Sequence, residues 1–357
     1  MRKVQVHSLI IFNFRKVAAA CLSAATALLI TACSPSSEIK PFVEYAKTGQ
    51  KYPVTINGTL GSITLTKQPE RVVVLGAGAA DIVAALGVQP LAVEHNTWGG
   101  DEQGYMPWFR AYLEKIGKPL PPTLTMFPEL DAEKLVSLQP DLIIAPQSGL
   151  SADTYHLLSG FAPVIAHPHQ PWLTTADEQL DIIAAALGRQ SYAQRLKAET
   201  EAHFAAFRRR HPQLQGCTFA YIYSGGREAN LSLYVIGEPR VDALIRLGLR
   251  MPPELEKMPL RPGTWSVSLG LENADKLNDA DILFTWFNSE KDQSAAESRP
   301  LYREIKAVKR GSYIPLLDRS LAAAMYHISP LSAPWGIERL EPYLTKAAVY
   351  LPKKGRQ

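Results

Sequence analysis

Short apolar runs alternate along the chain with longer segments of helical periodicity. The apolar runs predict strands at residues 71–75, 91–94, 141–145, 163–166, 217–223, 232–236, 282–286 and 313–316. Helical patterns between these runs cover residues 79–87, 131–138, 151–160, 239–248 and 298–306. Because this alternation is typical of parallel sheets covered by helices, the pattern predicts an α/β fold with parallel strands.

Two segments of the first half recur, in the same order, in the second half. DIVAALGV, which starts at Asp81, matches DALIRLGL, which starts at Asp242, and both predict a helix that ends in glycine before a strand. Further on, KLVSLQPDLIIAP and KLNDADILFTW each run through an aspartate, Asp141 or Asp281, into an apolar run. Two pairs of matches in the same order predict two similar lobes.

The longest helical pattern lies between the two halves, at residues 189–211. The stretch QSYAQRLKAETEAHFAAFRRRH contains no glycine or proline before Pro212. A helix of about twenty residues spans ~30 Å, so this segment predicts a rigid connection between lobes at residues 53–188 and 212–352. An ordinary helix that packs on one lobe is the alternative.

Residues 1–32 have the organisation of a secretory signal peptide. A basic region precedes an apolar stretch that is too short and too rich in alanine for a membrane span, and small residues end it. The sequence ITAC, which ends at Cys33, resembles the bacterial lipobox, so Cys33 is the expected lipidation site and residues 33–52 the expected tether. A plain signal peptide and an uncleaved anchor are alternatives, and Cys21 is a second, less well placed cysteine.

The net charge of +4 comes entirely from this N-terminal segment. Residues 1–32 contain four basic and no acidic residues, so 34 basic residues stand against 34 acidic ones in the remainder. This balance removes the electrostatic argument for nucleic-acid binding. The third cysteine, Cys217, stands in the apolar run CTFAYIY, which predicts a buried thiol.

Motifs of known enzymes are absent or incomplete in the sequence. The G-x-G turn at residues 76–78 follows a strand, but Asp81 replaces the third glycine of a dinucleotide-binding motif, so a tight turn is the better interpretation. No G-x-S-x-G, H-E-x-x-H, P-loop or EF-hand pattern occurs. His167 and His169 form a close pair, but the proline between them favours a rigid loop over a metal site.

Aromatic and basic side chains gather in the expected loops. Aromatic faces together with a few guanidinium groups suit a flat, partly apolar and negatively charged ligand. The residues predicted to bind such a ligand are Trp108, Arg110, Trp172, Arg227, Arg261, Trp265, Trp286 and Tyr326.

Several of these segments resemble a known family. PERVVVLGAGAADIVAALGVQPLAV, LDAEKLVSLQPDLIIAP, FAPVIAHPHQPW, GEPRVDALIRLGLRMP and SPLSAPWGIERL are similar to segments of the substrate-binding proteins of iron–siderophore ABC importers. The resemblance covers about residues 53–350, and GYMPWFR and QPW resemble the ferric-dicitrate-type branch. It implies the class III periplasmic-binding-protein fold, in which two Rossmann-like lobes are joined by a single long helix.

The resemblance also implies a function without catalysis. A ferric siderophore would bind in the cleft between the lobes, with no direct protein ligand to the metal and no resident cofactor, and would pass to the membrane permease and its ATPase. One acidic residue on each lobe would dock on the permease, and Asp153 and Glu238 hold those positions. The protein would be exported and anchored by its lipid, facing the periplasm or the outer cell surface.

Other functions stay open from the sequence. Cobalamin or haem is an alternative cargo for the same fold, with Tyr326 or His327 as an axial ligand of haem. An exported hydrolase and a purely structural surface lipoprotein are alternatives from other classes.

Overall fold

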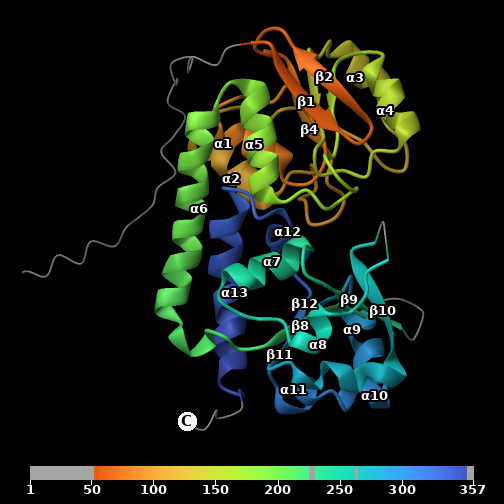
Figure 1. Cartoon of the computed structure of the whole chain (residues 1–357), viewed down its shortest axis with the longest axis vertical. Coiled ribbons are helices and arrows are strands. Elements are labelled where there is room, and N and C mark those ends of the chain that lie inside the picture. Colours follow the sequence, from red (N-terminus) through yellow and green to blue (C-terminus); the bar gives the residue numbers. More distant parts are fainter. Residues whose placement is uncertain (1–51, 225–229, 262–263, 352–357) are drawn as a thin grey trace, which may run out of the picture. The chain divides into compact units, whose positions relative to one another are not determined.

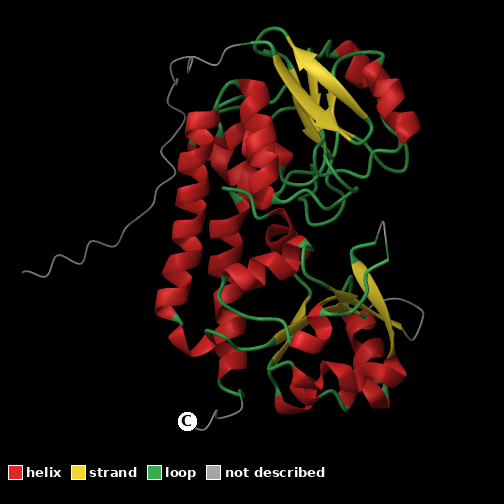
Figure 2. Ribbon diagram, in the orientation of Figure 1, coloured by secondary structure: helices red, strands yellow, loops and turns green. Residues whose placement is uncertain are grey.

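The computed structural model describes residues 52–224, 230–261 and 264–351, and all of them fall within one compact unit. Two separate five-stranded sheets, each flanked by helices, form two α/β lobes, and helix α6 (Gln190–Arg210) links them (Figure 1; Figure 2). The predicted α/β fold and the long linking helix are therefore confirmed. The predicted signal peptide and Cys33 lie outside the described residues, as does Arg227.

The sheet of the N-terminal lobe is entirely parallel, as predicted. Its strand order is β5-β4-β3-β6-β7. Val73 of the central strand pairs with Ala92 on one side and with Ile143 on the other. The strands are β3 (Val72–Val74), β4 (Ala92–Glu94), β5 (Thr123–Leu124), β6 (Leu142–Ile144) and β7 (Val164–Ile165).

Both faces of this sheet are buried, which explains the continuous apolar runs in the sequence. Val72 and Val74 point into a core with helices α1, α2 and α5, whereas Val73 points into a second core with α3 and α4. The helices are α1 (Ala79–Ala85), α2 (Pro107–Lys115), α3 (Ala132–Ser137), α4 (Ala152–Ser159) and α5 (Ala176–Leu187). An antiparallel hairpin of β1 (Val54–Gly58) and β2 (Gly61–Leu65), which the sequence pattern did not reveal, adds Ile56 and Leu65 to the first core.

The sheet of the C-terminal lobe has the equivalent order, β10-β9-β8-β11-β12. Strands β8, β11 and β12 are parallel, but β9 is antiparallel to β8, and β10 is antiparallel to β9. The expectation of parallel strands throughout is therefore wrong for this lobe, because β8 and β9 form a hairpin. The strands are β8 (Phe219–Tyr223), β9 (Asn230–Tyr234), β10 (Ser266–Gly270), β11 (Ile282–Trp286) and β12 (Tyr313–Leu316).

The helices of this lobe are shorter and more numerous than predicted. The single helix expected at residues 298–306 is divided between α10 (Pro300–Arg303) and α11 (Lys306–Arg310), with Glu304 and Ile305 between them. The helices are η1 (Pro212–Leu214), α7 (Pro239–Arg246), α8 (Pro253–Glu256), η2 (Leu271–Asp279), α9 (Glu290–Glu297), α10 (Pro300–Arg303), α11 (Lys306–Arg310), α12 (Arg319–His327) and α13 (Ser332–Ala348).

The repeated aspartates have the same structural role in both lobes. Asp141, just before β6, accepts a hydrogen bond from the backbone N–H of Arg71 at 2.9 Å, and Asp281, just before β11, accepts one from Thr218 at 2.9 Å. In each case the carboxylate fixes the start of the neighbouring central strand. The sequence repeat therefore corresponds to a repeated sheet geometry.

The C-terminal segment also connects the lobes. Helix α13 runs beside α6 (Figure 1), and residues of α12 and the loop after it, among them Ala323, Ala324 and Leu331, belong to a core of the N-terminal lobe. Ser329 Oγ donates a hydrogen bond to Asp81 of α1 at 2.7 Å. The lobe boundaries at residues 188 and 212 stay a prediction. Among the described residues, no helix has the length and apolar character needed to cross a membrane.

Candidate ligand-binding cleft

Two adjoining cavities, of about 260 and 470 Å³, lie at the carboxyl ends of the strands of the N-terminal lobe. They share Glu94, Phe127 and Trp172, and we call them together the strand-end cleft. Ligands of open α/β sheets bind outside the carboxyl ends of the strands, and the size of the cleft suits a small-molecule site. The other lining residues are Gly76, Ala77, His95, Asn96, Thr97, Trp98, Met106, Met126, Pro128, Glu129, Leu130, Ala132, Ser148, Gly149, Leu150, Ser151, Thr154, Leu157, Ala323, Tyr326 and His327.

The cleft combines elements from both halves of the chain. The segments that follow β3, β4, β5 and β6, together with Trp172 after β7, form most of the side of the N-terminal lobe. Helix α12 contributes Ala323, Tyr326 and His327 from the C-terminal segment. The strand-end cleft therefore depends on the tertiary structure, and no continuous motif encodes it.

The G-x-G turn forms the floor of the cleft by a close approach of backbones. Gly76 has φ +84°, and a Cβ there would lie 2.5 Å from the carbonyl oxygen of Gln147, so only glycine fits. Its N–H donates to Glu94 Oε2 at 2.6 Å. Asp81, 2% exposed, accepts hydrogen bonds from Trp108 Nε1 and Ser329 Oγ, both at 2.7 Å. Its carboxylate is thus held by hydrogen bonds from within the protein.

Trp172 and Tyr326 are held beside each other in the cleft. The backbone of Trp172 has φ +66°, and its carbonyl oxygen accepts from Gln147 Nε2 at 2.8 Å and from the Tyr326 hydroxyl at 3.4 Å. Gln147 Nε2 also donates to that hydroxyl at 3.1 Å. The indole lies over Gly149, where a Cβ would come within 2.6 Å of the Trp172 Nε1. Both predicted residues therefore offer pre-positioned aromatic surfaces.

Trp286 belongs to an aromatic cluster that reaches the cleft through Trp98. The ring of Trp286 stacks on Tyr223 at 4.3 Å between centroids and meets the edge of Trp98 at 5.0 Å. Trp98 lines the cleft, and its Nε1 donates to Asn288 Oδ1 at 3.1 Å, which ties the two lobes together. Trp286 thus supports the aromatic surface from behind.

The titratable side chains that line the strand-end cleft are mainly carboxyl groups and imidazoles. Its described lining residues include the carboxylates of Glu94 and Glu129 and the imidazoles of His95 and His327, but no lysine or arginine. Burial raises the pKa of Glu94, while the Gly76 N–H and the nearby His327 partly oppose this rise. Burial without a lysine or arginine partner disfavours the ionised form of this carboxyl group, and a strongly anionic ligand beside it would add to that cost.

Two predicted ligand contacts serve the protein interior and surface instead. Trp108 is 3% exposed, donates to Asp81, and packs against Trp335 at 5.2 Å between ring centroids, so it is a core residue. Arg110 Nε donates to Asp101 Oδ2 at 2.6 Å. Burial raises the pKa of the Asp101 carboxyl, but hydrogen bonds from Arg110 and from backbone N–H groups outweigh this effect and hold the pKa below its ordinary value. Both side chains of the pair are therefore ionised. Arg110 is therefore neutralised by its own lobe.

The remaining predicted contacts are not brought to the cleft by the described residues. Arg261 is exposed, and Trp265, just before β10, is 40% exposed. Arg227 lies outside the described residues. Their part in ligand binding stays a prediction.

The two predicted docking residues differ in exposure. Asp153 is exposed in the first turn of α4, where a partner can reach it. Glu238 is 1% exposed: it caps α7 by accepting from the N–H of Arg240 at 2.9 Å, and it pairs with the Arg240 guanidinium at 2.8 Å. A carboxylate enclosed and neutralised in this way is not presented to a partner, since capping of α7 already uses it.

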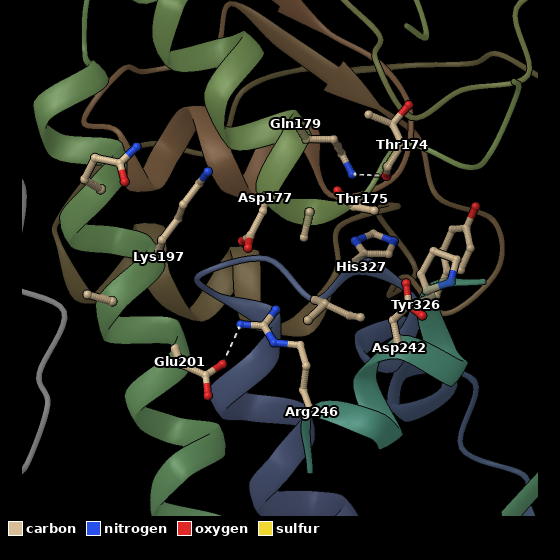
Figure 3. Close-up of a pocket in the computed structure, with 15 residues that line it drawn as sticks. Thr174, Thr175, Asp177, Gln179, Lys197, Glu201, Asp242, Arg246, Tyr326 and His327 are labelled. Atoms are coloured by element: carbon tan, nitrogen blue, oxygen red, sulfur yellow. Dashed lines mark hydrogen bonds and ion pairs between the residues drawn. The ribbon is translucent and has the colours of Figure 1, made fainter. Parts of the chain in front are cut away.

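A further cavity of about 570 Å³ lies between helices α5, α6, α7 and α12, and we call it the helix-side cavity (Figure 3). It is larger than either part of the strand-end cleft, but the cations that line it have protein partners. Lys197 Nζ binds Asp181 at 2.6 Å, and Arg246 binds Glu201 at 3.3 Å. The sides of helices line it more than strand ends do, so we take the strand-end cleft as the candidate site.

The sequence analysis did not select Glu94, Gln147 or Phe127 as binding residues. Glu94 ends a predicted strand, and the strand-end rule could have marked it. Gln147 and Phe127 carry no such signal, because their role follows from loop packing. In the part of the chain that the structure describes, no group of three or more metal-ligating side chains occurs.

With this geometry established, the chain can be assigned to a class. The periplasmic binding protein family model matches residues 72–317, so the chain belongs to that family. The match covers both five-stranded sheets and the whole of α6. The hairpin β1–β2 lies before it.

Three proteins with named ligands are similar to this chain. The chain is 27% identical over 263 residues to the Fe(3+) dicitrate-binding periplasmic protein FecB of Escherichia coli (strain K12), which covers 72% of this chain and 80% of the relative. The crystal structure of Streptococcus pneumoniae TIGR4 PiaA in complex with ferrichrome superposes with a TM-score of 0.75 at 26% identity, covering 84% of this chain and 99% of PiaA. Staphylococcus aureus SirA complexed with staphyloferrin B shares the fold, with a TM-score of 0.65 at 22% identity and coverage of 82% and 98%.

Proposed function

We propose that this protein is the substrate-binding component of an ABC importer and that it captures a ferric siderophore in the strand-end cleft. The ligand is bound and delivered to the membrane permease without chemical change. The family match and the siderophore-related names of FecB and PiaA support this function.

One observation carries the proposal: an aromatic cleft at the strand ends is shared between both halves of the chain. Trp172 and Tyr326 are fixed by Gln147, and Trp98 extends the aromatic surface toward Trp286. Aromatic and apolar surfaces bind the organic frame of a chelate, so the protein needs no iron ligands of its own.

The remaining parts of the proposal concern location and partners. Lipidation at Cys33 would anchor the protein outside the cytoplasmic membrane, at the periplasmic or outer surface. Asp153 is our candidate for permease docking on the N-terminal lobe, because it is exposed at the start of α4.

Fluorescence titration of the purified protein with ferrichrome, ferrioxamine B and ferric dicitrate tests the proposal. We expect at least one ferric chelate to quench the tryptophan fluorescence with saturation. Trp172→Ala removes one aromatic surface of the cleft and should weaken that binding by about tenfold, or ~1.4 kcal/mol. Phe161→Ala, at an exposed position outside the cleft, is the matched control and should leave the affinity unchanged.

Absence of saturable binding by every chelate would contradict the proposed function. Haem, the alternative cargo, would produce a Soret band on mixing. The structure favours the chelate over haem, because the Tyr326 hydroxyl is already bonded to Gln147 and to the Trp172 carbonyl.

A further inference from the structure

The charge of the strand-end cleft bears on the class of chelate that it accepts. Glu94, at the carboxyl end of β4, lines both cavities of the cleft. Its Oε2 is bonded to the Gly76 N–H, which fixes the carboxylate group in the cleft. Glu129 adds a second, exposed carboxylate at the rim.

No cation among the described lining residues offsets these carboxylates, apart from histidine. The predicted partner for an anionic ligand, Arg110, is bound by Asp101 at 2.6 Å. The imidazole of His327 lies near Glu94 and has its Nδ1 3.6 Å from Asp81 Oδ2. The described side of the cleft therefore offers carboxyl groups, and no guanidinium or ammonium group, to a ligand.

The rest of the lining is largely apolar. Met106, Met126, Leu130, Leu150 and Leu157 line the cleft together with its aromatic rings. Phe127, which lines both cavities, is 61% exposed. Apolar surface of this kind is buried favourably against hydrocarbon linkers and unfavourably against ionised carboxylates.

Ferric chelates differ in charge according to their donor groups. Each hydroxamate carries one negative charge when bound, so three of them cancel the charge of Fe³⁺ and leave a neutral complex, or a cationic one where the chelator bears a free ammonium. Citrate and related carboxylates bring more negative charge than iron neutralises, so their complexes are anionic.

We infer that Glu94 is a specificity-determining residue that makes the strand-end cleft select neutral or cationic hydroxamate chelates and reject anionic carboxylate chelates. This inference rests on the proposed function and names its ligand class. The selected chelate presents an ammonium or another hydrogen-bond donor to the Glu94 carboxylate and its hydrocarbon linkers to the apolar residues.

The test compares three ferric chelates of different charge by fluorescence titration: cationic ferrioxamine B, neutral ferrichrome and anionic ferric dicitrate. The wild-type protein should bind ferrioxamine B at least about tenfold more tightly than it binds ferric dicitrate. Glu94→Gln keeps an acceptor for the Gly76 N–H and removes the charge. It should weaken binding of ferrioxamine B by about tenfold, strengthen binding of ferric dicitrate, and change ferrichrome by less than about threefold.

Glu133→Gln is the matched control, because it removes an exposed carboxylate of α3 that does not line the cleft. It should change the ratio of the affinities by less than about threefold, since solvent screens an exposed charge. Thermal melting establishes that both variants are folded, and Glu94→Asp, which keeps the charge, provides a second variant that should retain the order of affinities.

The outcomes separate this inference from the proposed function. Tightest binding of ferric dicitrate by the wild-type protein, or an unchanged affinity ratio in Glu94→Gln, would overturn the inference while leaving siderophore binding intact. If none of the three chelates binds, both proposals fail.

Discussion

At the scale of single residues, polar groups of the interior connect the lobes more than they contact a ligand. Asp81 accepts hydrogen bonds from Trp108 of α2 and from Ser329 of the C-terminal segment. Since a buried carboxylate is costly unless it is hydrogen-bonded, each of these donors stabilises the folded state. Trp108 thus has a structural role, although its sequence context predicted a ligand contact.

This role of Trp108 gives a prediction at the residue scale. Trp108→Phe removes the N–H donor to a buried carboxylate and should lower the free energy of unfolding by about 1.5–3 kcal/mol, measured by urea denaturation. Chelate affinity should change little. Trp265→Phe, at an exposed position, is the control and should stay within about 0.5 kcal/mol of the wild type. Lost affinity with unchanged stability in Trp108→Phe would instead place this ring at the ligand.

At the scale of elements, local sequence signals set where the linking helices begin and end. Thr175 and Glu178 form a capping box at the start of α5, and Gly188 ends that helix in the left-handed conformation. Helix α6 then begins at Gln190, and at its other end Arg210 and His211 bind Glu341 of α13 at 2.7 and 2.6 Å. This cluster fixes the end of α6 to the neighbouring helix.

The cluster predicts a pH-dependent contribution to stability. Hydrogen bonding from Arg210 holds the pKa of Glu341 below its ordinary value of 4.5. The folded-state pKa is therefore the lower one, so the stabilisation is present at neutral pH and is lost as the pH falls through that pKa. Glu341→Gln should be less stable than the wild type at pH 7, by less than about 1 kcal/mol because the carboxylate is partly exposed.

Chemical denaturation from pH 7 downward provides the measurement for Glu341. The difference between the wild type and Glu341→Gln should shrink steadily below the ordinary pKa and disappear in acid. A difference that stays constant across this range would show that shape, not charge, governs the contact.

At the scale of the whole described unit, the lobes share their interior. Leu331, which follows α12, is packed in the core of the N-terminal lobe, while Met325 and Ile328 from the same segment belong to the core of the C-terminal lobe. Together with α6, this segment couples the lobes, so we expect small movements of the lobes on ligand binding.

The coupling predicts that both lobes unfold together. Leu331→Ala creates a cavity in the N-terminal core and should lower stability by about 2–5 kcal/mol. Differential scanning calorimetry should show a single transition at a lower temperature, with the C-terminal lobe included. Leu317→Ala, at a partly exposed site, is the control. Two separated transitions, of which Leu331→Ala shifts one, would contradict the coupling.

Much of the sheet architecture was predictable because buried strands leave continuous apolar runs. All eight predicted strands correspond to observed ones within a few residues. The hairpin β1–β2 was missed because its alternating, half-exposed pattern is weak, and the two-residue strand β5 and the partly exposed strand β10 were missed as well. The antiparallel direction of β9 could not be predicted, since strand direction depends on the connection and not on hydrophobicity.

The binding site was less predictable than the fold. Trp172 and Tyr326 lie in the cleft, but Trp108 and Glu238 are buried and Arg110 is paired within its own lobe. Aromatic and charged residues in loops look alike in sequence whether they face a ligand or the interior. Trp108 is bound by Asp81, which is far away in the sequence, and Glu238 is paired with the nearby Arg240. The sequence pattern does not reveal either pairing.

The sequence by itself determined the alternating α/β pattern, the duplicated aspartates and the unbroken helix α6, because these depend on local periodicity and on residues a few positions apart. Tertiary structure alone decided which carboxylates are neutralised and that Glu94 and Glu129 line the strand-end cleft. The physical reason is that the charge of a site depends on distances between side chains from different elements, and only folding sets those distances.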